Sequence, residues 1–408
     1  MSLNKTETEA MMHAEGLLHN LFDKTLSFDK RIRATLFSAA DSLIRCRHLS
    51  TTFLGRVLKG TAKIKHKIKR MDRLFGNVTL YAKKREIYQT IVFHLVKTNK
   101  RPVILIDWSG LTPCGTFHFL RASITVKGRS LTLYEETHPL KEYGSPKAHK
   151  SFLKTLKGLL PQDCRPIIIT DAGFRNTWFE QVLALGWDYI GRVRNRTHYY
   201  NKVEKCWEPI KMLYGQATMK AKYLGQMLLS KSNAIKCHFY IMRQEKKARK
   251  RRNLAGKEVR CSSSLKHAKR EKEPWLLVTS IAPVELNAVR ITLLYKKRMQ
   301  IEGSFRDLKN MNNGLGLRHC RSLSQERLNV ALLIAALAIF ALWIFGVASK
   351  IRNLHYSFQS NTEKKRAVLS NFTLGWQVLM CPEIKFSKEE LIAALNLVVL
   401  TTKEAALC

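Results

Sequence analysis

The chain has 408 residues, of which 71 are Lys or Arg and only 31 are Asp or Glu, so its formal net charge is +40. With 45% hydrophobic residues it can bury a sizeable core, which excludes wholesale disorder. A basic surplus this large indicates a polyanionic partner, most often nucleic acid, and the alternative is a merely basic protein of the ribosomal kind. The nine cysteines form no CxxC pair and no secretory signal begins the chain, so we expect a cytoplasmic protein.

Residues 1–98 read as helical, and their clearest feature is the basic amphipathic segment Lys63–Phe75. Ile64, Ile68, Met71 and Phe75 fall within about 40° on one face of a helix. The segment Ser50–Arg56 upstream resembles the first helix and turn of a helix-turn-helix unit, which predicts DNA recognition by the basic face. The alternative is a solvated basic face. The predicted DNA-binding residues are Lys65, Lys69, Arg70 and Arg73.

Residues 99–194 alternate between short apolar runs and two helical patterns, which predicts a mixed α/β layer. The expected strands and helices, in chain order, are strand Pro102–Asp107, the hairpin Phe117–Val126 and Ser130–Thr137, helix Ser145–Leu160, strand Pro166–Asp171, helix Thr177–Leu185 and strand Tyr189–Val193.

Two of these apolar strands are predicted to end in an acid, Asp107 and Asp171. Catalytic groups collect at the carboxyl ends of strands in open α/β sheets, so the two carboxylates could lie side by side. The alternative is that each Asp caps the turn that follows its strand.

Residues 195–285 are predicted to form a separate β unit interrupted by the basic, Ser-rich tract Arg243–Lys272, which reads as a mobile loop. Its expected strands are 198–200, 206–210, 221–229 and 235–242, followed by a strand that starts at Trp275.

Helical periodicity returns in 286–350, where Tyr295, Arg298, Glu302 and Lys309 share one arc of about 60° on a helix from Leu286 to Lys309. Such a stripe could be a solvated face with salt bridges, but the apolar neighbours predict a buried helix, whose polar stripe needs a partner. A metal site beside DNA would supply one. Asp107, Asp171 and Glu302 could hold two Mg²⁺ ions, which take hard oxygen ligands.

Arg298 and Lys309 would then contact phosphates, and Tyr295 would hydrogen-bond the DNA backbone or pack behind a carboxylate.

Further on, the uncharged segment Val330–Ala348 has the length of a membrane span. A helix that is apolar all round can also be the centre of a large domain, and we expect no membrane association. Residues 351–408 are expected to be helical.

These residues carry a resemblance to a known family. The acids Asp107, Asp171 and Glu302, with the Y-x2-R-x3-E-x6-K signature, resemble the DDE transposases of insertion-sequence family four. The blocks LIDWSG, LRASITVKGRSLTLYE, ITDAGF, KEPWLLVTS and KRMQIEGSFRDLKN through GLGLRH are similar to that family in the same order and cover nearly the whole chain.

The resemblance implies a fold and an activity. The fold would be an RNase H-like core in two parts, 99–194 and 286–350, interrupted by an inserted β subdomain at 195–285, with a helical DNA-binding domain before it and a helical C-terminus. The activity would be cut-and-paste transposition through a DNA hairpin, with two Mg²⁺ ions, for which Mn²⁺ would be able to substitute. The partners would be the double-stranded terminal repeats and target DNA, bound by a homodimer in a nucleoid-associated complex.

The resemblance also bears on single positions. Trp275 matches an aromatic that stacks on a flipped base, and the alternative is a core Trp in its strand. Many relatives carry a second acid directly after the catalytic glutamate, where this chain has Gly303. The competing function is a catalytically inactive, sequence-specific DNA-binding derivative, against which the three intact acids argue.

Overall fold

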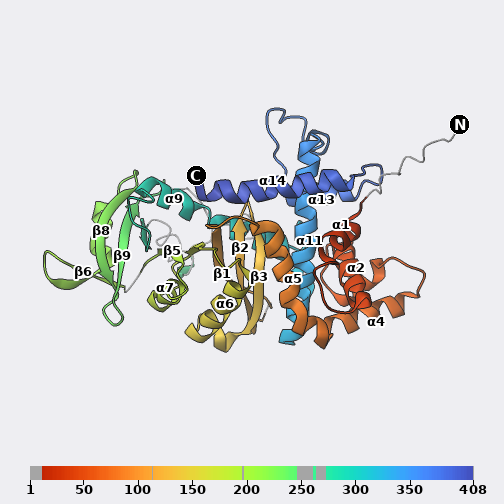
Figure 1. Ribbon diagram of the computed structural model, residues 1–408, viewed down its shortest axis with the longest axis horizontal. Helices are drawn as coiled ribbons and strands as arrows, with labels where there is room; N and C mark the ends of the chain where they lie inside the picture. Colours follow the sequence, from red (N-terminus) through yellow and green to blue (C-terminus); the bar gives the residue numbers. More distant parts are fainter. Residues whose placement is uncertain (1–11, 113, 195–196, 246–260, 263–272, 408) are drawn as a thin grey trace. The chain divides into compact units, whose positions relative to one another are not determined.

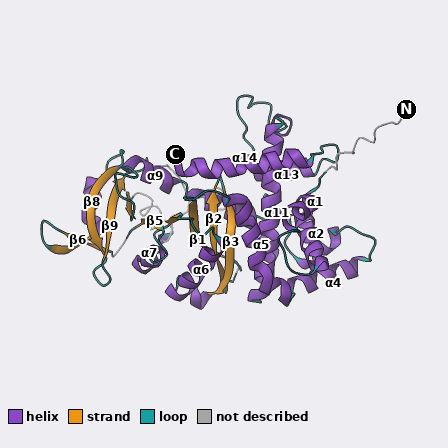
Figure 2. Cartoon of the chain, in the orientation of Figure 1, coloured by secondary structure: helices purple, strands orange, loops and turns teal. Residues whose placement is uncertain are grey.

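The computed structural model describes residues 12–112, 114–194, 197–245, 261–262 and 273–407. The chain divides into two compact units: unit 1 comprises Met1–Cys164 and Met299–Leu407, and unit 2 comprises Arg165–Arg298. Figure 2 shows that both units combine helices and strands. The chain is therefore a mixed α/β protein, as predicted, whereas the five-part division with boundaries near 98, 194, 285 and 350 stays a prediction.

Unit 1 begins with a set of short helices, as the sequence predicts. They are α1 (Ala14–Phe22), α2 (Lys30–Cys46), α3 (Thr51–Val57), α4 (Ile64–Phe75) and α5 (Val78–Val96). Side chains cap three of them: Asp29 accepts from the first amides of α2, Ser50 from Phe53 in α3, and Asn77 from Leu80 in α5. These caps satisfy amides that a helix leaves without partners, so the local sequence fixes where these three helices start.

An antiparallel sheet follows in unit 1, in the order β3-β2-β1. Its strands are β1 (Val103–Gly110), β2 (Phe117–Thr125) and β3 (Ser130–Pro139), so the predicted hairpin is confirmed. The 3₁₀ turn η1 (Leu140–Glu142) leads to α6 (Pro146–Leu159), which starts at the predicted place because Ser145 caps it and proline occupies its first turn.

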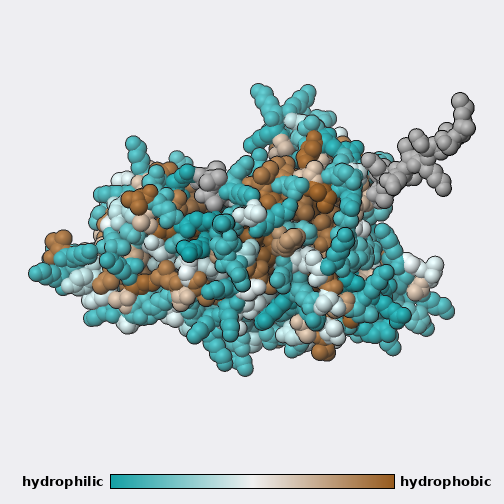
Figure 3. Space-filling view, in the orientation of Figure 1, coloured by the Kyte–Doolittle hydropathy of each residue, from teal (hydrophilic) through white to brown (hydrophobic). Residues whose placement is uncertain are grey.

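The rest of unit 1 is helical. Its elements are α10 (Met299–Lys309), η3 (Leu317–His319), α11 (Gln325–Ile351), α12 (His355–Phe358), α13 (Asn371–Leu379) and α14 (Lys388–Leu407). By length and composition α11 could cross a membrane, but its most apolar window is completely buried. It packs against α1 and α2, against α5 and β3, and against α13 and α14 (Figure 1). The segment Val330–Ala348 is therefore a core helix in this structure, and hydrophilic side chains cover most of the visible face (Figure 3).

Polar side chains of α11 also close the edge of the unit 1 sheet. Asn329 Oδ1 accepts from the backbone N–H of Thr137 (3.2 Å), and Gln325 Nε2 donates to its carbonyl (2.6 Å). Thr137 lies on β3, the edge strand, whose backbone groups would otherwise be open to another strand. Helix α11 thus provides hydrogen-bond partners for both backbone groups of Thr137 on the strand that it covers.

Unit 2 contains β4 (Ile167–Thr170), α7 (Asn176–Leu183), β5 (Asp188–Arg192), β6 (His198–Asn201), β7 (Cys206–Pro209), η2 (Ile210–Gln216), β8 (Lys222–Leu229), β9 (Ile235–Met242), β10 (Trp275–Thr279) and α9 (Ala288–Lys296). The order is β4-β5-β10-β9-β8-β6-β7, with β4 and β5 parallel and the other pairs antiparallel. Each predicted strand is present. Most of the predicted mobile tract Arg243–Lys272 lies outside the described residues.

The single helix predicted from Leu286 to Lys309 is wrong. The amides of Lys297 and Arg298 bond to carbonyls only three residues back, Leu294 and Tyr295, each at 3.0 Å. This tight turn ends α9 at Lys296, and α10 starts at Met299. The shared arc therefore holds only within α10, where Glu302 and Lys309, seven residues apart, differ by about 20°.

Two glycines allow α11 and α13 to touch at backbone distance. A Cβ atom on Gly375 would lie 1.9 Å from the Leu342 carbonyl oxygen, and one on Gly346 would lie 1.9 Å from that of Asn371. We expect Gly375→Ala to lower the free energy of unfolding by about 2 kcal/mol or more, because the helices must separate. Gly158→Ala, on α6 with nothing within 4 Å, should instead raise it by about 0.5–1 kcal/mol.

Urea denaturation of both variants measures these changes. If Gly375→Ala unfolds at the same urea concentration as Gly158→Ala, the two helices do not make this close contact.

Candidate functional site

Asp107 lies on β1, at the point where the strand changes from buried to half-buried. The prediction that it ends its strand is wrong. Strand β1 continues to Gly110, because it stays paired with β2 up to the pair Gly110–His118. The Asp107 carboxylate accepts a hydrogen bond from the amide of Trp108 (2.8 Å). Asp107 is therefore held by a regular strand instead of a loop.

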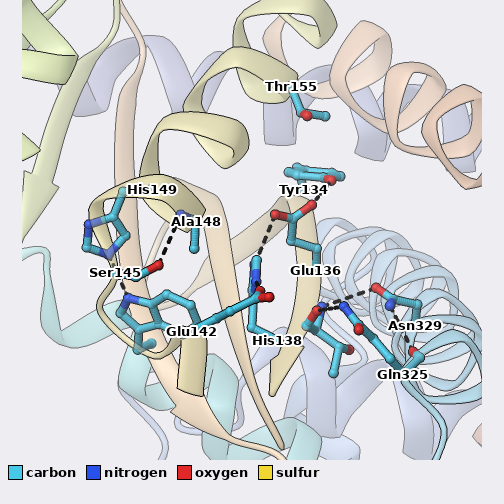
Figure 4. A network of polar contacts seen from close by, with 12 residues as sticks. Tyr134, Glu136, His138, Glu142, Ser145, Ala148, His149, Thr155, Gln325 and Asn329 are labelled. Carbon is cyan, nitrogen blue, oxygen red and sulfur yellow. Dashed lines mark hydrogen bonds and ion pairs between the residues drawn. The ribbon is translucent and has the colours of Figure 1, made fainter. Parts of the chain in front are cut away.

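A buried polar network fixes Trp108, the residue next to Asp107. Its indole N–H donates to Nε2 of His149 on α6 (2.9 Å), and its ring meets His138 edge-on at 5.2 Å. Nε2 can accept because the ring is neutral, and burial lowers the pKa of His149 to about 4. His138 lies between Glu136 (3.0 Å) and Glu142 (2.9 Å), as Figure 4 shows. Burial lowers the pKa of His138, but its bonds to these carboxylates outweigh burial and raise it overall.

Helix α10 brings Glu302 and Lys309 into the same unit as Asp107. The side chain of Glu302 is exposed, whereas Lys309 is half-buried and its ammonium donates to Ser109 Oγ on β1 (2.6 Å). Burial lowers the pKa of Lys309 to about 8; Arg121 and Arg318 lower it further, while Asp107 raises it. In this structure α10 and the Asp107 strand therefore lie together, linked by the Lys309–Ser109 hydrogen bond.

Arg121, which the sequence analysis missed, lies beneath α10. It stands opposite Asp107 in the β1–β2 register and opposite Glu135 in the β2–β3 register, so the three charges share one face of the sheet. Arg121 and Glu135 are fully buried and form an ion pair of 2.6 Å. The guanidinium also lies 5.2 Å from the rings of Phe119 and Phe305. The signal in the sequence was an Arg inside an otherwise apolar strand.

Gly303 has a packing role in this structure. A Cβ atom there would lie 2.9 Å from Cδ of Arg129, whose guanidinium crosses α10 to pair with Asp307 (2.9 Å). The absence of a side chain at 303 therefore lets the β2–β3 turn attach to the helix that carries Glu302.

Asp171, in unit 2, directly follows β4 as predicted. Its carboxylate accepts a hydrogen bond from the Gly173 amide (2.8 Å), so it stabilises the turn, as the alternative interpretation expected. This bond uses one oxygen only, and a carboxylate can accept several bonds.

Tyr295 and Arg298 also lie in unit 2, around the end of α9. Tyr295 is only 3% exposed, and burial raises its pKa; Arg298 and Arg192 act against this shift, and Asp171 adds to it. A further pair of cations was not predicted from the sequence. Arg192 is the last residue of β5, and Arg194 follows two residues later. Their signal was the alternation of Arg after an apolar strand.

Trp275, at the start of β10, is half-buried and meets the Tyr295 ring edge-on at 4.9 Å. Its place supports both interpretations, since a half-buried ring can pack on Tyr295 and still present a face to a ligand. The stacking role stays a prediction.

The basic face of α4 is exposed, and its apolar face packs inward through Met71, Leu74 and Phe75. Lys65, Lys69, Arg70 and Arg73 are exposed, while Ile64, predicted to belong to the apolar face, is 56% exposed because it starts the helix. Arg70 donates to Thr35 Oγ1 on α2 (2.8 and 3.1 Å). Gly55 lets α3 approach Ile68 of α4 closely, and the helix-turn-helix assignment stays a prediction.

The predicted metal ligands are divided between the units, with Asp107 and Glu302 in unit 1 and Asp171 in unit 2. Among the residues that the structure describes, no three His, Cys, Asp or Glu side chains form a group that could hold a metal ion. The three-carboxylate site therefore stays a prediction.

The buried ammonium of Lys309 leads to a stability prediction. Its pKa of about 8 lies below the ordinary 10.5, so charging this lysine costs free energy in the folded protein at neutral pH. We expect Lys309→Met to raise the free energy of unfolding at pH 7 by about 2 kcal/mol, after loss of the Ser109 hydrogen bond. The wild type gains stability as the pH rises from 8 to 10.5, so the difference should shrink over that range.

Denaturant unfolding between pH 7 and pH 10.5 measures this difference, with the exposed Lys157→Met on α6 as the control, expected within about 0.5 kcal/mol of wild type. A Lys309→Met variant that is no more stable than this control at pH 7 would show that the ammonium is well solvated.

Comparison with known proteins assigns the chain to a protein family. A family profile described as "Transposase DDE domain" matches residues 98–341, more than half of the chain. No curated protein sequence matches. Among solved structures, the chain is similar to a piggyBac transposase in a cryo-EM synaptic complex with hairpin DNA, at 11% identity over 96% of this chain and 79% of that chain, with a TM-score of 0.40. From the family match we conclude that the chain belongs to the transposase DDE-domain family.

Proposed function

We propose that this protein is an insertion-sequence transposase of family four, which cleaves DNA at the element's ends and transfers the strands to a target through a hairpin. The observation that carries the proposal is the family match over 98–341, which includes Asp107, Asp171 and Glu302. It is supported by the Lys309–Ser109 bond, which holds α10 against the strand of Asp107.

The proposed core is RNase H-like. Residues 99–194 and 286–350 would form it, and the strands of 195–285 would be an insertion before the helix of Glu302. The mixed parallel and antiparallel pairing in unit 2, together with the antiparallel β1–β3 sheet of unit 1, supports this assignment.

The proposed metal ligands are Asp107, Asp171 and Glu302. All three are at least partly exposed carboxylates, and hard oxygen donors of this kind suit Mg²⁺ or Mn²⁺. When bound, two such ions would stabilise charge on the attacking and leaving oxygens of the phosphodiester. The strand register sets the buried Arg121 opposite Asp107, so a positive charge lies on the same face of the sheet as this proposed ligand.

Other residues of the chain would hold the DNA. Lys309 and Arg298 would contact phosphates, which position the strand without reading its sequence. Trp275 would offer its open face to a base flipped out during hairpin formation, with Tyr295 supporting the ring from its edge. The partners would be terminal-repeat and target DNA, bound by a homodimer in the nucleoid of a bacterial cytoplasm.

Replacing the three acids tests the assignment. We expect Asp107→Ala, Asp171→Ala and Glu302→Ala each to abolish Mg²⁺-dependent cleavage of a duplex that contains the element's end. Their affinity for that duplex should persist, because basic residues that contact phosphates carry most of it. Gel assays of nicking and binding measure both properties.

The control is Asp163→Ala, an exposed acid paired with Lys100, which should cleave like the wild type. Near-normal nicking by Glu302→Ala would contradict the assignment. A wild type that binds the end duplex specifically but cuts it with neither Mg²⁺ nor Mn²⁺ would favour the inactive DNA-binding derivative.

The exposed face of α4 is the proposed reader of the element's end. Because Arg70 is already bonded to Thr35, Arg73 is the better candidate for a base contact. We expect Arg73→Ala to cost about 1–3 kcal/mol of binding to the end duplex and to relax specificity at one position. Replacing a residue that contacts only phosphate should weaken end and random duplexes alike and lower the salt slope by about one unit.

Titrations of end and random duplexes at several salt concentrations separate these results, with Lys388→Ala on α14 as the control. If Arg70→Ala and Arg73→Ala both match the control on both duplexes, α4 is a solvated basic face and recognition lies elsewhere.

A further inference from the structure

Unit 1 contains a cavity of about 960 Å³ beside α3. Part of its lining comes from α3 and the residues just before it, and another part comes from residues 319–324, which run from the end of η3 to the start of α11. The cavity therefore joins the proposed end-recognition helices to the segment that follows α10. No residue assigned above to catalysis or DNA contact lines it.

The lining is strongly basic. It includes Arg56, Arg321 and Arg327, and none of the described residues that line it is Asp or Glu. Arg327 is paired with Asp72 at 2.5 Å, so its charge is largely neutralised. Arg56 and Arg321 are exposed, and neither forms an ion pair within the part of the chain that the structure describes. Two open guanidinium groups in one cavity favour an anion, and phosphate suits their geometry.

Three rings are stacked along the cavity. The ring centroids of Phe53 and His48 lie 3.8 Å apart at 15°, and those of His48 and His319 lie 3.6 Å apart at 12°. The Arg56 guanidinium lies 5.3 Å from the centre of the Phe53 ring. His48 is covered on both faces by the other two rings, whereas Phe53 is 39% exposed and can still contact a ligand. Aromatic side chains beside cations are typical of sites that hold a nucleic-acid strand.

Polar groups of the cavity support the same kind of ligand. The lining includes five hydroxyl side chains: Ser50, Thr51, Thr52, Ser322 and Ser324. Phosphate oxygens are acceptors only, and they match a lining of arginines, imidazoles and hydroxyls.

We propose that this cavity binds a DNA strand, with one backbone phosphate held by Arg56 and Arg321 and the neighbouring nucleoside against Phe53. The inference rests on the proposed function, which supplies DNA as the partner. A strand bound here contacts α3 of the recognition unit and the 319–324 segment at once. The cavity thereby adds a contact for DNA between end recognition and the helix of Glu302, within a single unit.

The test measures binding of a random-sequence 30-base-pair duplex and the matching single strand from 50 to 300 mM salt. The double variant Arg56→Gln/Arg321→Gln should bind both roughly tenfold or more weakly and lower the salt slope by about one unit or more. Phe53→Leu should weaken the single strand roughly fivefold to a hundredfold with little change of slope. The matched control, Lys388→Gln on α14, should bind like the wild type.

Thermal unfolding confirms that each variant is folded, and Arg321→Gln alone, at an exposed position, keeps the test valid if the double variant is unstable. A wild type that binds no duplex overturns the proposed function, and this inference with it. If the wild type binds but the arginine variants match Lys388→Gln, only this inference is overturned. If inorganic phosphate raises the melting temperature of the wild type but not of these variants, while all bind DNA equally, the cavity holds a free anion and the DNA assignment is wrong.

Discussion

Unit 1 is organised around helix α11, whose residues 328–349 are all buried. Because α11 is apolar on every side, leaving any side uncovered would expose hydrophobic area at a cost of about 25 cal/mol per Å². Helices from both ends of the chain and the edge strand β3 therefore pack around it. Gly346 and Gly375 bring α13 to backbone contact, and Asn329 and Gln325 satisfy the strand edge. The sheet that carries Asp107 is held in place by this helix.

A second constraint is electrostatic and lies on the sheet beneath α10. Asp107, Arg121 and Glu135 occupy opposed positions on three neighbouring strands, and Lys309 reaches down from the helix to Ser109. Burying Arg121 with its partner stabilises little by itself, but removing one member would leave an unpaired buried charge. Lys309 also costs stability while it is charged. Such arrangements are typical of sites where function sets the charges, so they fit a site that binds a polyanion.

The structure also relates DNA recognition to the rest of unit 1. Helices α3 and α4 present a basic exposed face on one side, and α3 lines the cavity formed with residues 319–324 on another. Arg327 joins the two regions, because it pairs with Asp72 of α4 from the first turns of α11. On the proposed function, DNA held by α3 and α4 would be attached to the same unit as Glu302 and Asp107.

The sequence by itself determined most elements, since caps such as Ser145, apolar runs such as 167–170 and the amphipathic period of α4 act locally. It also determined which acids are candidates, because apolar strands followed by Asp are visible without coordinates. Tertiary structure alone decided the rest. Pairing with β2 extended β1 past Asp107, and a tight turn divided α9 from α10, since backbone hydrogen bonds outweigh side-chain periodicity at both places. Arg121 escaped detection because the strand register that sets it opposite Glu135 forms only on folding, and the stacked column escaped detection because His319 is distant in the chain from His48 and Phe53.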